Sequence, residues 1–367
     1  MRPWSRVVLC LALATAFLST QASAQIRTVL VSPVPGNPSA SGSALLAAVA
    51  GIASPSSTNT WLVKIEPGIY DVGATPLQMR SWIDIEGSGI GVTTIRGTVD
   101  PLLTGFFTRG TVNGASNAEL RLLTVEANGT SSIPGVIAMV NPQASPRIYR
   151  VRFATHGVNA GWGIRNPEGA PLIEECEIEV SLTQAGTAYG IVYANQVSGT
   201  PSVIRRTKIA VTGTQTSYGI YLTDGQTVRE IWDSKITVSG GVSVYGLYSI
   251  WSGGVQDRLQ LRNVDLSTGS ATNLAAGIYF DSNQVFYLDV VDSRIYGTTY
   301  GIRSLSSSTV EVRNSELVGF TNTATTAGSM SITMSGLRGG PATAGGWLGC
   351  AGVWDESGTF YPGPACP

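Results

Sequence analysis

The stretch 218–236, YGIYLTDGQTVREIWDSKI, contains both of the motifs that recur along this chain. The first motif is a glycine followed by an aliphatic residue, often with an aromatic residue before it. The second motif, aliphatic-x-x-small-x-aliphatic, is clearest at Ile231–Ile236, Val290–Ile295 and Val312–Leu317. Repetition every 24 to 31 residues predicts a solenoid, in which each unit buries its apolar face against its neighbours. The glycines of the first motif are Gly163, Gly190, Gly219, Gly246, Gly277 and Gly301.

Within each unit the apolar residues alternate with polar ones, which predicts short strands and no helix. Equivalent strands of successive units should stack, so that identical positions form inward ladders. The first ladder is Leu120, Ile148, Ile173, Ile204, Ile231, Leu261, Val290 and Val312. The second ladder is Val125, Phe153, Ile178, Ile209, Ile236, Leu266, Ile295 and Leu317.

Between these ladders the spacing leaves room for one tight turn. Asparagine and aspartate tolerate the left-handed conformation and bond locally, so we place the turn at positions that favour them. The turn positions are Glu175, Arg206, Asp233, Asn263, Asp292 and Asn314. Small inward residues follow, among them Cys176, Thr207, Ser234 and Ser293.

This repeat resembles the pectin-lyase-like superfamily of right-handed parallel β-helices, over the mature chain up to about residue 335. The resemblance implies an all-β solenoid whose open end is closed by a short helix. Residues 41–49, SGSALLAAV, fit such a helix, with a serine opening a run of good helix formers. Residues 336–367 are expected to form a separate Gly/Pro-rich tail that covers the last coil.

The first residues predict a secretory signal peptide over 1–24. Arg2 and Arg6 precede an apolar run, and Ala22-Ser23-Ala24 fits a cleavage site, so the mature chain should begin at Gln25. We therefore expect a secreted, periplasmic or extracellular protein without a membrane span. Removing residues 1–24 leaves 21 basic and 24 acidic residues. That balance argues against nucleic acid as a partner.

Three cysteines remain after cleavage. Cys350 and Cys366 close a loop near the C-terminus, and an oxidising compartment favours a disulfide between them. Cys176 lies in an inward position of the repeat and is interpreted as a small buried apolar residue.

Catalytic motifs are scarce in the sequence. His156 is the single histidine, which excludes a multi-histidine zinc site, and no cofactor or metal is expected. Asp224 and Asp281 follow corresponding Gly-Ile motifs two coils apart, about 10 Å, and are the only candidate catalytic pair. Motifs typical of the superfamily's polygalacturonases, pectinesterases and pectate lyases are missing.

A surface stripe gives a better candidate for ligand binding. The position two residues after each motif glycine should face outward. At that position lie Arg165, Val192, Tyr221, Tyr248, Tyr279 and Arg303. Three tyrosines between arginines would suit stacking on sugar rings and pairing with acidic groups. The alternative is that these tyrosines are strand formers whose rings stack between coils.

The sequence therefore favours an exported, non-catalytic β-helix that binds or is displayed at a surface, with polysaccharide as the expected partner. The resemblance leaves open a polysaccharide lyase or glycoside hydrolase. A structural passenger or assembly component without a ligand is the third reading.

Overall fold

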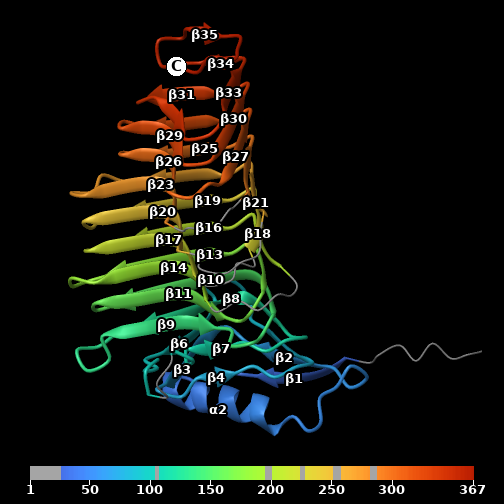
Figure 1. Ribbon diagram of the computed structural model, residues 1–367. Helices are drawn as coiled ribbons and strands as arrows, with labels where there is room; N and C mark the ends of the chain where they lie inside the picture. The colour runs from blue at the N-terminus through green and yellow to red at the C-terminus, as the bar shows by residue number, and fades with distance from the viewer. Residues whose placement is uncertain (1–25, 104–106, 195–200, 224–227, 251–257, 282–286) are drawn as a thin grey trace, which may run out of the picture.

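The computed structural model describes residues 26–103, 107–194, 201–223, 228–250, 258–281 and 287–367. The predicted signal peptide, residues 1–24, lies outside this part of the chain. Of the described residues, 57% are in strands and 4% are helical. Apart from the last hairpin, all ladder pairings are parallel and join equivalent segments of neighbouring repeats. The fold is thus the right-handed parallel β-helix that the repeat predicts, with coils stacked from the N-terminus at the bottom to the C-terminus at the top (Figure 1).

Each full coil contributes two strands to a large sheet and one to a second sheet. In the large sheet one row of strands carries the first inward ladder. These strands are β1 (Arg27–Val31), β2 (Trp61–Ile65), β5 (Ile83–Glu86), β8 (Glu119–Asn128), β10 (Arg147–Gly157), β12 (Leu172–Glu174), β15 (Ser202–Arg205), β18 (Val228–Trp232), β21 (Arg258–Arg262), β24 (Tyr287–Val291), β27 (Thr309–Arg313), β30 (Ser329–Thr333) and β33 (Leu348–Ala351).

The other row of the large sheet carries the second ladder. Its strands are β3 (Gly68–Gly73), β6 (Thr93–Gly97), β13 (Glu177–Leu182), β16 (Lys208–Thr212), β19 (Lys235–Ser239), β22 (Asp265–Thr268), β25 (Arg294–Gly297), β28 (Glu316–Gly319), β31 (Gly336–Gly339) and β34 (Val353–Trp354). β8 and β10 run through both rows, and the final strand β35 (Phe360–Tyr361) pairs antiparallel with β34.

The second sheet has 11 strands and faces the large one across the core. Its strands are β4 (Leu77–Gln78), β7 (Val112–Asn113), β9 (Gly135–Val140), β11 (Ala160–Pro167), β14 (Thr187–Ala194), β17 (Thr216–Thr223), β20 (Ser243–Ile250), β23 (Leu274–Phe280), β26 (Tyr300–Ser304), β29 (Asn322–Thr326) and β32 (Ala342–Ala344).

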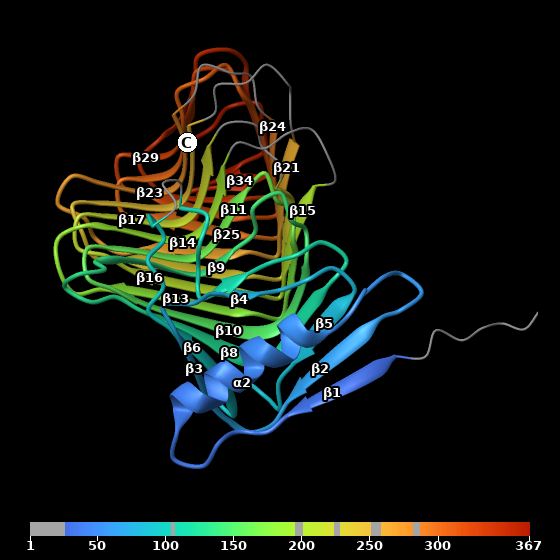
Figure 2. The same cartoon turned by 90° about the horizontal axis from the view of Figure 1, so that it is seen from below.

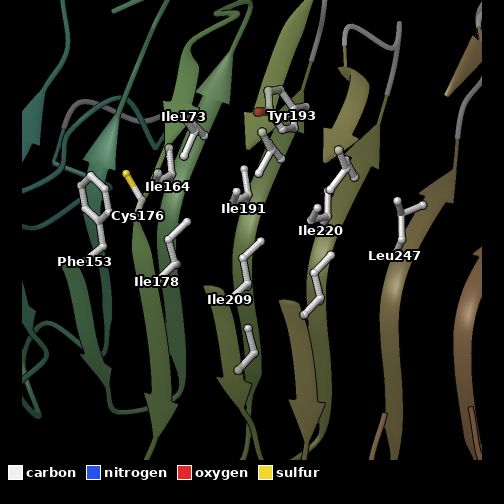
Figure 3. Packing of buried hydrophobic residues seen from close by; sticks show 14 of the residues in the cluster. Phe153, Ile164, Ile173, Cys176, Ile178, Ile191, Tyr193, Ile209, Ile220 and Leu247 are labelled. Atoms are coloured by element: carbon white, nitrogen blue, oxygen red, sulfur yellow. The ribbon is translucent and has the colours of Figure 1, made fainter. Parts of the chain in front are cut away.

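Both inward ladders have the predicted register. Ile173 is aligned with Ile148 and Ile204, and Ile231 is aligned with Ile204 and Leu261. In the second ladder Ile178 is aligned with Phe153 and with Ile209. A third ladder from the 11-stranded sheet, which includes Ile164, Ile191, Ile220 and Leu247, packs against these two (Figure 3). The core is therefore one continuous apolar column.

The helix that closes the N-terminal end is longer than predicted. α2 (Pro38–Gly51) begins after Asn37, whose side-chain oxygen accepts from the Ala40 amide at 3.0 Å. The expected cap, a serine near residue 41, is wrong, because Ser41 lies inside the helix and its hydroxyl donates to the Asn37 carbonyl. The helix lies across the bottom of the solenoid (Figure 2), where Gly42 is so close to the Asp71 carbonyl that a Cβ would approach to 2.0 Å.

At the other end, the parallel pairing continues past residue 335 through β31 and β33. The Cys350–Cys366 disulfide is confirmed, and Cys176 is free and buried, as expected. Burial raises the pKa of the Cys176 thiol to about 12, so it is not a reactive thiolate. None of the helices in the described ranges is long and apolar enough to cross a membrane.

Candidate functional site: the outer face of the 11-stranded sheet

The outer face of the 11-stranded sheet presents two aromatic residues per coil in its central part. In β17, Tyr218 and Tyr221 both lie on this face, because Gly219 and Ile220 between them are both buried. Gly219 cannot be replaced without strain, since a Cβ there would lie 2.4 Å from the Gly246 carbonyl oxygen. The glycine of the first motif therefore permits the local backbone that turns both tyrosines outward.

The aromatic side chains form two columns of stacked rings, which together we call the aromatic face. Trp162, Tyr189, Tyr218 and Tyr245 form the first column, with ring centroids 5.5, 5.1 and 5.2 Å apart. Tyr221, Tyr248 and Tyr279 form the second column, with spacings of 5.6 and 5.4 Å. The columns contact each other through tilted pairs, such as Tyr245 and Tyr248 at 4.7 Å.

Arginines lie beyond both ends of the second column: Arg303 is aligned next to Tyr279, and Arg165 is separated from Tyr221 by Val192. Arg165 has its guanidinium 5.5 Å from the Phe107 ring and donates to the Phe107 carbonyl at 3.1 Å, and burial lowers its pKa. Arg303 lies over Tyr279 at 5.2 Å and over Tyr300 at 4.6 Å. Neither guanidinium forms an ion pair with a carboxylate anywhere in the described residues. Arg165 is thus held by an aromatic ring and a carbonyl, and Arg303 is held by two aromatic rings.

One carboxylate interacts with the aromatic face. The Tyr248 hydroxyl donates to Asp281 at 3.1 Å, and the Asp281 side chain is exposed. Burial raises the pKa of Tyr248, and the negative charge of Asp281 raises it further. Tyr248 therefore stays protonated at neutral pH and acts as a hydrogen-bond donor rather than as a general base.

The structure brings all of the predicted stripe into one column. Arg165, Val192, Tyr221, Tyr248, Tyr279 and Arg303 are aligned from strand to strand in that order. The sequence reasoning missed the first column, although Trp162, Tyr189, Tyr218 and Tyr245 were visible as aromatic residues that directly precede a motif glycine. The sequence reasoning assumed strict alternation along the strand, which would place residues three apart on opposite faces of the sheet. It therefore did not predict that both tyrosines of a strand face outward.

Stacking within each column changes how a sugar can reach these rings. The faces of the middle rings contact the neighbouring coils, and Tyr279 is only 7% exposed. Because the ring faces are covered by neighbouring rings, a ligand can reach the middle rings only from their edges. A ligand would therefore meet ring edges and phenol oxygens rather than a set of flat ring surfaces, and the hydrogen of the Tyr248 hydroxyl is already donated to Asp281.

The structure adds no support for Asp224 and Asp281 as a catalytic pair. Asp224 lies outside the described residues, and Asp281 is bonded to Tyr248. Among the residues with described positions, no group of three or more His, Cys, Asp or Glu side chains is arranged to hold a metal ion.

Comparisons with known proteins give only distant likenesses. No family model matches the chain, and no curated protein matches it. One similar solved structure is the A-module of mannuronan C-5 epimerase AlgE6 from Azotobacter vinelandii, 15% identical with a TM-score of 0.42 over 86% of this chain and 95% of that chain. The AlgE4 A-module of the same organism is 14% identical, with a TM-score of 0.36 over 83% and 91%. The catalytic unit of a GH87 alpha-1,3-glucanase from Streptomyces thermodiastaticus strain HF3-3 is 13% identical, with a TM-score of 0.31 over 89% and 70%.

Proposed function

We propose that this chain is an exported, non-catalytic β-helix that binds polysaccharide at a surface through the aromatic face. The observation that carries the proposal is the pair of stacked columns, with an arginine beyond each end of the second one that forms no ion pair within the described residues. Successive coils repeat about every 4.8 Å, so the columns present hydroxyl groups at a regular spacing along the rod. A linear polymer of sugars, which carries hydroxyl groups at regular intervals, matches such an array.

The stacking also fixes the rings before any ligand arrives. A tyrosine held between two neighbours has already lost its rotamer freedom, so binding costs less side-chain entropy. Each phenol contributes a modest hydrogen bond, of roughly 0.5–1.5 kcal/mol. A single chain should therefore bind weakly, and multivalent display should strengthen retention.

The rival activity, cleavage of a glycan by lyase or hydrolase chemistry, needs an acid or base in the correct protonation state. The raised pKa of Tyr248 disfavours the phenolate that a base would require. The alternative role as a structural passenger predicts no ligand at all, and binding measurements separate it from the proposal.

The sharpest test replaces Tyr221, Tyr248 and Tyr279 together by phenylalanine. This triple variant keeps the ring stacks and removes the three hydroxyl groups, including the one that donates to Asp281, so we expect only a small fall in Tm and weaker retention on polysaccharide affinity gels. The corresponding alanine variant should lose retention as well, but with lower stability, because each stacked pair contributes about 0.5–1.5 kcal/mol. Retention of the phenylalanine variant equal to that of the unmodified protein would refute hydrogen bonding by this face.

The two arginines allow a separate test of ligand charge. Replacing Arg165 and Arg303 by Gln should weaken retention of acidic glycans only, and more strongly at low salt. Equal losses on neutral and acidic polymers would show that the arginines act through the fold rather than through ligand charge.

A further inference from the structure

A groove lies on the large sheet, along the turns with left-handed backbone that join its two rows of strands. We call it the turn groove; its volume is about 840 Å³, within the range of ligand sites. The floor follows the turn residues, and the outward side chains of β16, β19, β22, β25, β28 and β31 form one wall. The aromatic face belongs to the other sheet, so the two surfaces are separate. The charged and aromatic lining residues are Arg206, Lys208, Asp233, Lys235, Asp265, Asp292, Arg294, Glu316, Arg338 and Trp354.

Charges of both signs alternate along this wall and hold one another in place. Lys235 pairs with Asp265 at 3.2 Å, and Glu316 pairs with Arg294 at 3.2 Å and with Arg338 at 2.8 Å. With five cations and four anions among the lining residues, the groove has no strong preference for either charge sign. A polyanion or a strongly basic peptide would therefore gain little here.

Two carboxylates on the floor are left for a ligand. Asp233 accepts from the Asn263 amide at 2.8 Å, and Asp292 accepts from the Asn314 amide at 2.6 Å. Within the described chain neither carboxylate forms an ion pair. Both side chains are exposed, so each keeps free lone pairs for hydroxyl donors.

A tryptophan closes the C-terminal end of the groove. Trp354, on β34, lies against Gly336, where a Cβ would come within 2.8 Å of the indole nitrogen. Its side chain is 41% exposed, and no stacked or edge-on ring partner exists for it in the part of the chain that the structure describes. Unlike the tyrosines of the aromatic face, it keeps ring surface open to solvent.

We propose that the turn groove is a second glycan site, which binds the end of a neutral oligosaccharide against Trp354. A sugar ring carries an apolar C–H side that packs on an aromatic ring, and hydroxyl groups that bond carboxylates and amides. Trp354 supplies the first contact, and Asp233 and Asp292 supply acceptors further along the groove. Because positive and negative charges are nearly balanced, the groove suits an uncharged ligand. Trp354 lies at one end of the groove, so the end of an oligosaccharide chain would lie against its ring.

The test titrates the full-length mature protein with cellohexaose, maltohexaose and xylohexaose by calorimetry. We expect at least one to bind, and Trp354→Ala to weaken its Kd roughly tenfold or more. The matched control is Trp347→Ala, because Trp347 is 61% exposed at the same end of the molecule but lines a different cavity. Absence of binding by all three oligosaccharides, or an equal loss in both variants, overturns the proposal.

Three further measurements guard against misfolding and against confusion with the aromatic face. Oxidation by N-bromosuccinimide, read by mass spectrometry, should be suppressed by the ligand at Trp354 and not at Trp347. The double variant Asp233→Asn and Asp292→Asn keeps residues suited to the turn, and we expect a Kd at least about threefold weaker. The Tyr→Phe triple variant of the aromatic face should bind these oligosaccharides normally. Unchanged oxidation of Trp354, an unaffected double variant or loss of binding in the Tyr→Phe variant each contradicts a separate turn-groove site.

Discussion

A single residue in each coil sets the corner between the two rows of the large sheet. Glu175, Arg206, Asp233, Asn263, Asp292 and Asn314 have φ between 47° and 53°. The small residue that follows often stabilises the corner through its hydroxyl group. The Ser293 hydroxyl donates to the Val291 carbonyl at 2.7 Å and accepts from the Val264 amide of the coil below at 3.0 Å. The corner is thus held both within a coil and between coils.

The free energy of unfolding of variants at the corner should depend on how readily the new residue adopts a positive φ. Asn263, with φ of 52°, is exposed, so Asn263→Val should lower the free energy of unfolding by about 1–2 kcal/mol through left-handed strain. Asn263→Gly should be nearly neutral, because glycine adopts this conformation freely. Urea denaturation of the two variants measures the difference. Equal stabilities would mean that the backbone at this corner relaxes out of the left-handed region.

Substitution in the first ladder tests the core. Ile231 is fully buried between Ile204 and Leu261. Ile231→Asp should cost at least about 3 kcal/mol, since the carboxylate would have no partner there. Ile231→Val is the matched control and should cost about 1 kcal/mol. An aspartate variant as stable as the valine variant would contradict the buried ladder.

The sequence predicted the inward or turn position of individual residues well. Positions such as Ile231 and Ile178 were predictable because inward side chains repeat once per coil in the same place. The turn residues were predictable because asparagine and aspartate mark left-handed backbone. Tyr218 was missed as an outward residue, because its neighbour Gly219 interrupts the alternation that the prediction relied on.

Two elements close the ends of the solenoid by different means. At the bottom, α2 packs against β3, and its start was not predictable from Ser41 because Asn37 and Pro38 provide a stronger start signal. At the top, the tail crosses the last coil, where the Pro364 carbonyl accepts from the Cys350 amide at 3.2 Å. This bond covers part of the open edge of β33, which otherwise would offer unpaired backbone groups to another chain.

The disulfide should matter chiefly for that terminal element. Cys350 and Cys366 are 16 residues apart, so Cys366→Ser should remove about 3 kcal/mol in the chain-entropy model. Alkylation of the folded protein without reductant should label none of Cys176, Cys350 and Cys366, as Cys176 is buried. Labelling of Cys366 in the native protein would contradict the bond. Limited proteolysis should release the tail of the serine variant before the solenoid unfolds.

Across the whole molecule, ion pairs connect the outward faces of neighbouring coils. Asp289 is nearly buried between Arg313 at 2.6 Å and Arg258 at 2.8 Å. Burial alone would raise the pKa of Asp289, but the hydrogen bonds and charges of the two arginines outweigh it and hold the pKa below its usual value. In the same way, against the effect of burial, hydrogen bonds from Lys64 and Arg121 lower the pKa of Glu86, and hydrogen bonds from Asn128 and Arg96 lower the pKa of Glu126.

These shifts fix the direction of the pH dependence. A carboxylate whose folded pKa is depressed stabilises the protein above its unfolded pKa, near 4, and that stability is lost as the pH falls through the folded pKa. The Tm should therefore fall below about pH 4. Asp289→Asn should be less stable at pH 7 and show a shallower fall. A Tm profile with the same slope in both proteins would mean that Asp289 keeps an ordinary pKa.

The central functional claim concerns the molecule as a whole, since it separates a binding rod from an enzyme. The most direct test is a glycan array read together with reducing-sugar and unsaturated-product assays on the same polysaccharides. We predict retention of at least one polysaccharide, weakened in the Tyr221, Tyr248 and Tyr279→Phe variant, with no product from any polymer. Release of reducing ends or unsaturated sugars would contradict the non-catalytic assignment, and failure to bind any glycan would contradict the role of the aromatic face.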